Sequence, residues 1–558
     1  MVDAAEHSTE AEPLKGEETV VGVTSVTDPS PFKKSDCAGR LGMSHLSGWR
    51  TGTFLLSLFL CLTVVFAFSF ILPCPVRPQY QRTWNRTIPG AVTYDFLAVE
   101  DATKDKVRDV FIIYKRSEGM ANNTCTSEGL SAPCLFLLAV DGTDGETLWE
   151  RPLSADFDWA VCGVGGLSET GTGCLIAHND NLTAVDTHTG VILWQQLRTP
   201  VRGGDLPLVH LPDLDGDGAT DFALVTHSPS QTVLAFVSGR TGDVIGSEVV
   251  VDSGTSLAHL PYITASGGQY LLLHKDSGLY AVGLWWLAGQ AKSGLEVKLK
   301  KDKNWEERAS SRPGHILIFE SVSLRRVVEV RRSGRGSVSP LLLLTDSTIT
   351  LLHENLLTAS WSMNISNLLS APAFGHYNTD EVPDLVIEED IGNSTKRVVI
   401  LDGHTGSALW EVRLQFTPQT PRPSSVLTIN DYSVFMLWGQ TPIHPNNTDV
   451  EEKSSYLLHP YHSNLLLERK SPFQHIIAFK ATLLERSRHA SYLVLTGQDG
   501  GQSDGVLPVT LTKRKIKDDV PESSVLRVGG AGGVVVSTDS EEYIKEIFYR
   551  LRFSNEPQ

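Results

Sequence analysis

The chain lacks the sequence signatures of common catalytic sites. It has no P-loop, no nucleophile elbow and no zinc-type spacing of histidines, and its 17 histidines are scattered. Basic charge is also scarce, since the formal net charge is −17. An acidic surface repels phosphate, which argues against a nucleic-acid partner. We therefore expect no catalytic residues and a partner other than nucleic acid.

Long apolar runs are scarce too, with one exception between Phe54 and Leu72. These 19 residues carry no charge. A helix of this length reaches across a hydrocarbon core of about 30 Å. A cleavable signal peptide is the competing interpretation, but 53 residues precede the run and no small-x-small cleavage site follows it. The sequence predicts a transmembrane signal-anchor helix over residues 53–73.

The flanking basic residues do not orient this segment, because three lie on each side of it. Glycosylation motifs decide instead. All six Asn-x-Ser/Thr sites follow the span and none precedes it. We expect a single-pass type II membrane glycoprotein, with a C-terminal part that is extracellular or lumenal and the cell surface as the favoured location. The predicted glycosylation sites are Asn85, Asn122, Asn181, Asn364, Asn393 and Asn446.

Of the seven cysteines, four form two short-range pairs after the predicted span. We expect disulfides Cys125–Cys134 and Cys162–Cys174, although four cysteines allow three connectivities. Cys74 is left over beside the predicted bilayer. It is free, lipidated, bridged to a second copy, or a thiol without a role.

The composition divides the chain into five segments. A Ser-, Thr- and Glu-rich tail is expected to be disordered and cytoplasmic, and the anchor follows it. The largest segment is a succession of short apolar runs separated by turn residues, which is an all-β pattern. Near the C-terminus, apolar residues recur at i, i+3, i+4 and i+7, as in an amphipathic helix. The predicted segments are 1–52 (tail), 53–73 (anchor), 74–90 (stalk), 91–512 (β ectodomain) and 513–558 (linker and C-terminal helix).

A hairpin motif recurs within the β segment. A strand leads into a turn with Thr-Gly or a close variant, and the next strand carries Leu-Trp. Glycine supplies the positive φ at the reversal. Together with a worn copy and three fainter ones, the hairpins number seven, and the spacing suits four-stranded blades. We predict a β-propeller of seven blades, with eight as the alternative. The clear copies are 140–149, 185–194 and 401–410, the worn copy is 237–246, and the fainter ones lie near 279–286, 353–361 and 459–467.

A calcium-type loop runs from Asp213 to Asp221. Carboxylates stand at positions 1, 3, 5 and 9 and glycine at position 6. Ca²⁺ requires six or more oxygen ligands, and glycine permits the tight bend. Position 12 is Leu224 instead of the bidentate Glu of an EF-hand, so the loop opens a strand. A hydrogen-bonded Asx turn is the alternative, but four carboxylates would repel one another without a cation. The predicted Ca²⁺ ligands are Asp213, Asp215, Asp217, Ala219 and Asp221.

Two further loops keep part of this pattern. The first has Lys106 where glycine belongs, and the second, over 376–384, begins with histidine. Both retain carboxylates at positions 5 and 9. The weaker candidate ligands are Asp101, Thr103, Asp105 and Asp109 of the first loop.

The Asp-x-Asp-x-Asp-Gly-x-x-Asp loop resembles the FG-GAP repeats of integrin α-subunits. The anchor followed by Pro-Cys-Pro, together with the segments 94–99, 147–152 and 487–490, is similar to the integrin-α FG-GAP repeat-containing protein 3 group, also called family with sequence similarity 234, member A. The resemblance covers nearly the whole ectodomain and the anchor. It implies a single-pass membrane protein with a propeller-like ectodomain and FG-GAP-like repeats. Unlike integrin α-subunits, the chain has the opposite membrane orientation and one well-formed metal loop.

The Trp hairpins also resemble the repeats of quinoprotein dehydrogenases, in which the motif locks blades together through a buried Trp. The adjacent cysteine pair found in many of those enzymes is missing. We therefore expect a noncatalytic protein-binding platform that is stabilised by Ca²⁺. Its partner would be a cell-surface ligand or a multipass membrane protein to which the chain is an accessory subunit. A quinoprotein-like redox enzyme is the second alternative.

Overall fold

The computed structural model separates the chain into two units, Met1–Arg77 and Pro78–Gln558. The residues that it describes are 48–71, 83–116, 123–154, 156–168, 171–197, 208–227, 231–252, 256–275, 278–308, 315–321, 323–330, 339–353, 358–417, 420–440, 453–485, 487–500, 507–528 and 540–554.

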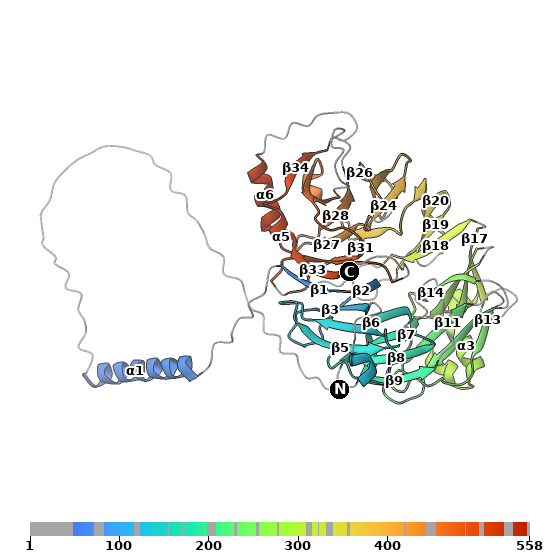
Figure 1. Ribbon diagram of the computed structural model, residues 1–558, viewed down its shortest axis with the longest axis horizontal. Coiled ribbons are helices and arrows are strands. Elements are labelled where there is room, and N and C mark those ends of the chain that lie inside the picture. The colour runs from blue at the N-terminus through green and yellow to red at the C-terminus, as the bar shows by residue number, and fades with distance from the viewer. Residues whose placement is uncertain are drawn as a thin grey trace, which may run out of the picture. The chain divides into compact units, whose positions relative to one another are not determined.

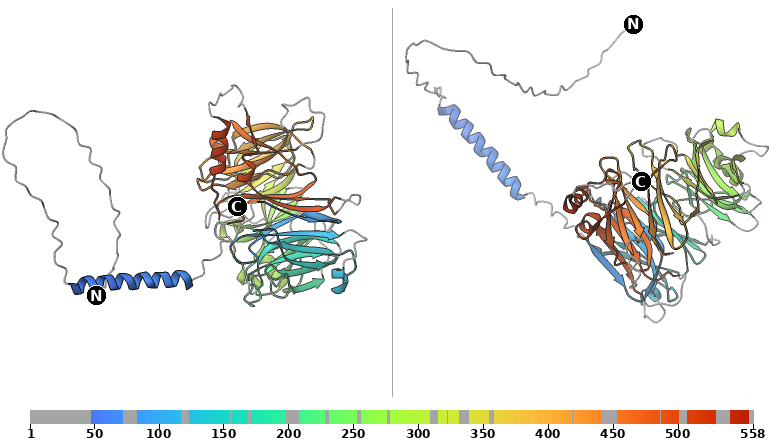
Figure 2. Two further views of the ribbon diagram at one scale, coloured as in Figure 1. Left: turned by 60° about the vertical axis from the view of Figure 1, so that its left-hand side comes forward. Right: turned by 90° about the horizontal axis from the view of Figure 1, so that it is seen from above.

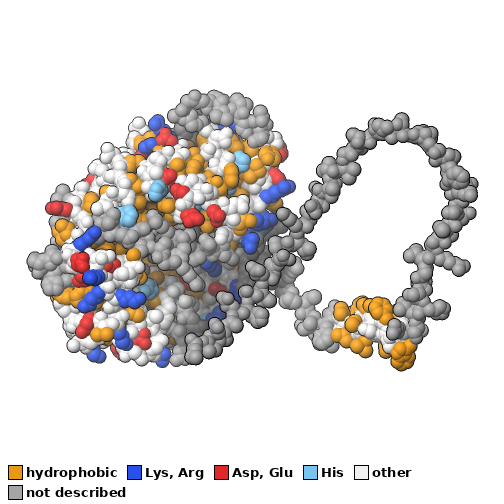
Figure 3. All heavy atoms as spheres, turned by 180° about the vertical axis from the view of Figure 1, so that it is seen from behind, with side chains coloured by type: hydrophobic (Ala, Val, Ile, Leu, Met, Phe, Trp, Pro, Cys, Tyr) orange, Lys and Arg blue, Asp and Glu red, His pale blue; other side chains and the backbone are white. Residues whose placement is uncertain are grey.

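The first unit contains the helix α1 (Gly48–Ile71), which is 24 residues long. Its side chains are described at 48, 49 and 51–67, and most of them are apolar and exposed (Figure 3). The hydroxyl of Thr53 donates to the Trp49 carbonyl, which satisfies it within the helix. Counted over the described residues, no helix combines the length and the hydropathy needed to cross a membrane. The transmembrane span over 53–73 stays a prediction.

The second unit is a β-propeller in which the described residues form eight sheets. Figure 1 shows the colour running round the ring from β2 to β33. Most blades are antiparallel meanders of four consecutive strands, and the first strands of several neighbouring blades contact one another. The middle strands are almost continuously buried, as in β4 (Leu135–Val140). The blades therefore build their cores mainly against one another, and the ring confirms the all-β propeller prediction.

The strands group into blades in chain order. Blade 1 has β2 (Ala91–Glu100), β3 (Asp109–Arg116), β4 and β5 (Thr147–Leu153); blade 2 has β6 (Phe157–Ser168), β7 (Gly171–His178), β8 (Asn181–Asp186) and β9 (Ile192–Leu197); blade 3 has β10 (Leu208–His210), β11 (Phe222–His227), β12 (Thr232–Val237) and β13 (Val249–Asp252); blade 4 has β14 (Ser256–Ile263), β15 (Gln269–Lys275), β16 (Gly278–Gly283) and β17 (His315–Glu320). Blade 5 has β18 (Leu324–Glu329), β19 (Leu341–Thr345), β20 (Thr348–Leu352) and β21 (Ala359–Asn364); blade 6 has β22 (Asn367–Leu368), β23 (Ala373–Gly375), β24 (Asp384–Asp390), β25 (Thr395–Leu401) and β26 (Ala408–Gln415); blade 7 has β27 (Ser424–Leu427), β28 (Ser433–Gly439), β29 (Ser454–Leu458), β30 (Leu465–Lys470) and β34 (Ser524–Arg527); blade 8 has β31 (Ile476–Thr482), β32 (Ser491–Thr496), β33 (Val509–Lys515) and β1 (Trp84–Ile88).

The N-terminal strand β1 closes the ring. It pairs antiparallel with β33, from Trp84 opposite Lys513 to Ile88 opposite Val509, and Figures 1 and 2 show it beside the C-terminal strands. This corrects two predictions. Residues 84–88 belong to the propeller and not to a stalk over 74–90. The blade number is eight, which was the alternative, and not the seven that was favoured, because the fourth strand of blade 8 comes from the N-terminus and forms no hairpin with β33.

The C-terminal residues also belong to the propeller, which corrects the boundary predicted at 512. Strand β33 continues to Lys515, α5 (Ile516–Asp519) follows, and β34 adds a fifth strand to blade 7. The amphipathic helix is present as α6 (Glu541–Arg550), capped by the Ser540 hydroxyl. Its buried Ile544 and Phe548 join a core cluster of blades 7 and 8. The helix thus packs against the propeller.

The other helices lie in the connections between strands. Three of them, α3 (Leu284–Ala291), η1 (Leu295–Lys298) and α4 (Lys303–Glu306), stand between β16 and β17. The helix α2 (Asn123–Ser127) precedes β4, and η2 (Pro460–His462) precedes β30.

Both predicted disulfides are confirmed. Cys125–Cys134 joins α2 to the residue before β4, with 6.0 Å between the Cα atoms. Cys162–Cys174 joins the paired strands β6 and β7, with 4.0 Å between the Cα atoms. Cys61 lies exposed on α1, and Cys74 lies outside the described residues.

The alternation of strand direction gives the propeller two unlike faces. The turn face carries the loops between the first and second strands of each blade and the turns between the third and fourth. The crossover face carries the second-to-third connections and the links between blades. The candidate metal loops, 101–109, 213–221 and 376–384, all lie on the turn face.

Candidate metal site

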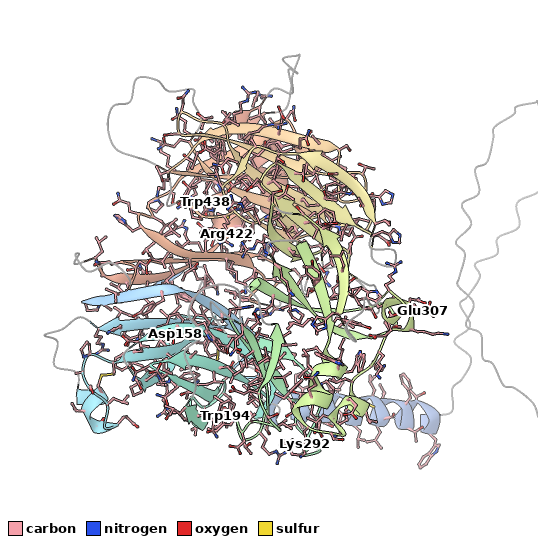
Figure 4. All side chains as sticks on the ribbon, turned by 90° about the vertical axis from the view of Figure 1, so that its right-hand side faces the viewer. Asp158, Trp194, Lys292, Glu307, Arg422 and Trp438 are labelled. Atoms are coloured by element: carbon pink, nitrogen blue, oxygen red, sulfur yellow. A yellow bond between two sulfur atoms is a disulfide. The ribbon has the colours of Figure 1, made fainter. Side chains whose placement is uncertain are left out.

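The turns on the turn face receive a tryptophan from the preceding blade. In each case the indole Nε1 donates to a carbonyl of the next blade's turn, and Figure 4 labels one such residue, Trp194 of β9. A buried Trp contributes a large apolar area, and its N–H has a partner here. These contacts explain the Leu-Trp hairpins and lock five seams between blades. The pairs are Trp84 with Gly142 at 3.3 Å, Trp149 with Thr187 at 3.0 Å, Trp194 with Gly239 at 3.0 Å, Trp361 with Gly403 at 3.1 Å and Trp410 with Ser463 at 2.7 Å.

The glycine of the Thr-Gly pair has two roles at these seams. Gly242 has a φ of 74°, a conformation that favours glycine. A Cβ on Gly242 would also lie 2.5 Å from the Trp194 ring. The equivalent Gly190 and Gly406 face Trp149 and Trp361 in the same way. The turn therefore needs glycine for its backbone and for the ring that packs on it.

The aspartate at position 9 of each candidate loop braces the loop to the turn of its own blade. Asp109 accepts a hydrogen bond at 3.0 Å from the backbone N–H of Gly142. Its other oxygen accepts from the N–H groups of Ala102 and Thr103 at the start of the loop. Asp221 bonds Gly239, and Asp384 bonds Gly403, each at 3.0 Å. A carboxylate at position 9 is thus explained without a metal ion.

These braces have perturbed acidity. Burial raises the pKa of Asp109 and of Asp384 to about 6, against the opposing effect of their backbone hydrogen bonds. Burial raises the pKa of Asp221 as well.

The loop over 213–221 brings three carboxylates together. Asp213, Asp215 and Asp221 each offer an oxygen, and the three atoms lie within 4.8 Å of one another. Hydrogen bonds from the backbone of Gly216 at 2.5 Å and Gly218 at 3.0 Å hold Asp213 in place. The bond from Gly216 lowers the pKa of Asp213, so this carboxylate is ionised at neutral pH.

Two other predicted ligands are arranged differently. Asp217 accepts from the Ser238 hydroxyl at 3.3 Å and lies 3.8 Å from the Arg240 guanidinium. The backbone N–H of Ala219 donates to Asp217 at 2.8 Å. Three of the five predicted positions therefore form the carboxylate group. Their hard oxygen donors suit Ca²⁺, and a complete shell of six or more oxygens would need backbone carbonyls or water.

The two related loops are held by their own hydrogen bonds. Asp101 accepts from the N–H of Lys106 at 3.0 Å, and Asp105 accepts from Val107 at 2.7 Å. The Thr103 hydroxyl donates to Asp109 at 3.2 Å. In the loop over 376–384, the Asn378 amide donates to Asp402 at 3.2 Å. Within the described ranges, neither loop gathers three carboxylates as 213–221 does.

The predicted glycosylation sites lie mainly toward the crossover face. Asn181 begins β8, Asn364 ends β21, and Asn393 lies in the turn between β24 and β25. Asn85 is the exception: it is exposed on the outer strand β1, next to Trp84 and therefore at the turn-face end of the strand. Asn122 and Asn446 fall outside the described residues.

One buried group at the ring closure is absent from the predictions. Glu485 accepts from Lys513 and from Lys515, each at 2.7 Å, and Glu485 and Lys513 have no exposed side-chain surface. Lys513 also donates to the Gly142 carbonyl, which accepts from Trp84 as well. The sequence contains no local pattern for this group, because Glu485 lies in a loop and its two lysine partners lie in β33.

These features define an eight-bladed β-propeller whose blades are locked by tryptophan at five seams. A family model described as the FAM234A/B beta-propeller matches residues 84–554. Rat Protein FAM234A (Rattus norvegicus) is 36% identical over 92% of this chain and 92% of its own length, and human Protein FAM234A (Homo sapiens) is 33% identical over 100% of each chain. Mouse Protein FAM234B (Mus musculus) is 28% identical over 84% of this chain and 77% of its own length. The chain belongs to the FAM234A/B β-propeller family.

Two solved structures are similar at low identity. The Dos1 propeller matches with a TM-score of 0.42 and 9% identity over 78% of this chain and 95% of its own. BamB from Moraxella catarrhalis matches with a TM-score of 0.36 and 13% identity over 69% of this chain and 96% of its own.

Proposed function

We propose that the chain is a noncatalytic type II membrane glycoprotein whose propeller is a protein-binding platform outside the cytosol. The observation that carries this proposal is the closed ring with its repeated tryptophan contacts. Such a frame presents loops from several blades in fixed positions, which suits recognition of another protein. The same contacts account for the Trp hairpins without a quinone pocket, so the redox alternative is the weaker one. A quinone or flavin absorption band in the purified protein would reverse that order.

The anchor in this proposal is α1. Its 24 residues would extend about 36 Å at 1.5 Å per residue, and no charge occurs from Phe54 to Leu72. The two disulfides support an oxidising compartment for the propeller. The six acceptor motifs after the anchor support the same side of the membrane, with the cell surface as the favoured location.

Ca²⁺ in the loop over 213–221 is part of the proposal. Asp213, Asp215 and Asp221 would hold the ion, which would relieve the repulsion among their carboxylates and stiffen blade 3. We expect Ca²⁺ to raise the melting temperature of the purified protein and Asp215→Ala to remove that rise.

The matched control for this test is Asp243→Ala, which removes an exposed carboxylate from a turn of the same blade. Its carboxylate accepts from the Gln196 amide at 3.0 Å, so the control is judged by the rise in its melting temperature with calcium, which should equal that of wild type. Equal melting of wild type and Asp215→Ala under both conditions would show that the loop is an Asx turn without an ion.

The partner in this proposal is a protein, either a ligand on another surface or a multipass protein of the same membrane. Crosslinking on intact cells followed by purification separates the two. A stoichiometric multipass partner recovered from the same cell supports an accessory subunit. Crosslinking only between neighbouring cells supports adhesion, and the absence of any specific partner in both arrangements contradicts the platform.

A further inference from the structure

We infer that a cavity at the crossover end of the seam between blades 6 and 7 holds the first sugar of a glycan on Asn393. The ligand is an N-acetylglucosamine unit that is attached to the same chain that binds it. This inference deepens the proposed function and rests on it, since it assumes that the propeller is glycosylated. It assigns a binding site and a structural role to one of the six acceptors.

The cavity lies where blade 6 meets blade 7 and has a volume of about 240 Å³. That volume far exceeds the roughly 10–15 Å³ that a single water needs, so a small organic group can enter. Its walls come from the turn between β24 and β25, from the end of β26 with the link that follows it, and from the connection between β28 and β29. The lining includes Ser394, Phe416, Thr417, Thr420, Gln440 and Lys453.

Backbone hydrogen bonds hold these walls in place. The N–H of Gln415, at the end of β26, donates to the Gln440 carbonyl at 2.7 Å, and the Gln440 N–H donates back to the Gln415 carbonyl at 2.9 Å. In the link between the blades, the Thr420 N–H donates to the Thr417 carbonyl at 2.9 Å, and the Thr417 N–H donates to the Thr420 hydroxyl at 3.1 Å. The walls are therefore ordered before a ligand binds, which lowers the entropic cost of binding.

The acceptor Asn393 is exposed beside the cavity. Asn393 and Ser394 each have a φ of 53°, and the Thr395 N–H donates to the Gly392 carbonyl at 3.0 Å, which makes the hairpin tip a type I′ turn. Asparagine tolerates this conformation. Ser394 lines the cavity, and its carbonyl accepts from the Phe416 N–H at 2.9 Å. A sugar on Asn393 thus begins one residue away from the cavity wall.

The lining suits the chemistry of this sugar. An N-acetylglucosamine unit is uncharged and has an apolar C–H face, several hydroxyl groups and an acetamide. Phe416 is half-buried and is the aromatic residue of the lining, and hydroxyl and amide side chains surround it. Among the described residues that line the cavity none is acidic, although the net charge of the chain is −17. A neutral ligand with one apolar face therefore fits better than a cation.

The covalent attachment favours this sugar over one in free solution. A cavity of this size makes few contacts with a single sugar unit, so a free monosaccharide would bind weakly. A ligand tethered to the neighbouring residue has an effective concentration on the order of millimolar. Once bound, the sugar would brace the crossover end of a seam whose turn-face end is held by the contact from Trp410 to Ser463.

The test measures how fast a peptide N-glycosidase releases glycan from native full-length protein purified from cells. The enzyme must reach the first sugar, and each release converts Asn to Asp, which mass spectrometry detects site by site. We expect release at Asn393 to be roughly tenfold slower than at Asn364, which is exposed at the end of β21, a protection equivalent to about 1.4 kcal/mol. After denaturation the two sites should be released at similar rates.

Phe416→Ala removes the aromatic ring and should raise the release rate at Asn393 to that at Asn364. Phe416→Leu keeps an apolar side chain without the ring and should give a smaller increase. Release at Asn364 in the same molecules should stay as in wild type, which shows that the fold is kept. The control is Tyr461→Ala, which removes an exposed aromatic ring from η2 on the turn face of blade 7 and should leave both rates unchanged.

Three results would overturn the inference while leaving the glycoprotein proposal intact. They are glycan at other acceptors but none at Asn393, release from native protein that is as fast at Asn393 as at Asn364, and slow release at Asn393 that Phe416→Ala does not change. Absence of glycan at every acceptor is a different result. It would overturn the proposed location outside the cytosol, and the sugar site with it.

Discussion

The seams between blades are of two kinds, and the difference shows how a propeller with degenerate repeats remains a closed ring. Five seams use a tryptophan on the turn of the next blade. The seams between blades 3 and 4, 4 and 5, and 7 and 8 have no such contact among the described residues. At these three, inserted or terminal elements supply the packing.

Each of the three seams is braced differently. Between blades 3 and 4, the helix α3 contributes Leu287 and Ala288 to the shared cluster. Between blades 4 and 5, Trp305 of the inserted helix α4 joins the shared cluster, and the Tyr262 hydroxyl donates to the Ser339 carbonyl at 3.0 Å. Between blades 7 and 8, α6 buries Phe548. Insertions at these places therefore compensate for the lost repeat contact.

The largest effect is expected at the ring closure, where Glu485→Gln should destabilise the propeller by about 3–5 kcal/mol, the usual cost of breaking a buried ion pair. The substitution leaves Lys513 and Lys515 buried without their counter-charge. Denaturant unfolding of the purified protein measures it. Glu411→Gln, in a pair with Arg397 whose Glu is 47% exposed, should cost less than about 1 kcal/mol. Equal losses would show that the closure does not depend on the buried group.

A matched pair of glycines tests whether the Thr-Gly turn requires glycine because of the Trp ring packed on it or because of its backbone conformation. Gly242 and Gly218 have similar φ values of 74° and 86°, but only Gly242 faces a Trp ring. The left-handed backbone should cost both Ala variants roughly 1–2 kcal/mol of stability. Gly242→Ala should lose about 1–3 kcal/mol more, because its Cβ overpacks against the Trp194 ring. Thermal melts of the two variants in the presence of a chelator measure this difference. If both variants melt at the same temperature, the Trp194 ring is not the reason for glycine at position 242.

Trp194→Phe separates the hydrogen bond from most of the apolar contact. It leaves the Gly239 carbonyl without the indole donor, which is expected to cost about 1–3 kcal/mol. The comparison is Trp286→Phe, at a residue of α3 that packs against the cluster shared by blades 3 and 4. This variant should lose less stability, and chemical unfolding measures both. If Trp194→Phe leaves the free energy of unfolding unchanged, the buried apolar area alone holds the seam together.

The α6-braced seam should be sensitive to acid. Burial lowers the pKa of His459 to about 4 from the ordinary value of 6.5, with the neighbouring His462 adding repulsion. Its neutral Nδ1 accepts from the Tyr461 N–H, and its ring lies 6.1 Å from that of Phe548. The folded pKa is depressed, so below 6.5 the unfolded chain binds a proton that the native protein does not.

This contribution is complete above pH 6.5 and is lost as the pH falls toward 4, with a slope of up to about 1.4 kcal/mol per pH unit. Buried Asp109 and Asp384 act in the opposite sense between 3.8 and about 6. The comparison is therefore made between wild type and His459→Gln, in melts at pH 7 and pH 5. We expect the variant to lose less stability over that interval, and an unchanged difference would contradict the assignment.

The sequence predicted the fold well because its signal is local. Strand, turn and Leu-Trp lie within ten residues, so each hairpin could be recognised separately. Eight blades were predicted only as the alternative to seven, because the outer strand of blade 8, β1, is more than 400 residues away from its partner β33. Trp84 was the one available signal. It has the same role as the tryptophans of the Leu-Trp hairpins but lies outside any hairpin.

The candidate site was predictable only in part. The acidic pattern pointed to the loop over 213–221, and three of its carboxylates do converge. The pattern did not show that position 9 is a brace, because the partners, Gly142, Gly239 and Gly403, lie in another connection of the blade. The group around Glu485 depends on tertiary contacts that no local spacing records.

The functional account depends on the propeller lying outside the cytosol, and the most direct measurement is site-resolved mass spectrometry of the full-length protein from cells, with and without enzymatic removal of N-glycans. The account predicts glycan at Asn181, Asn364 and Asn393. Unmodified asparagine at all of these positions in mature protein would contradict it.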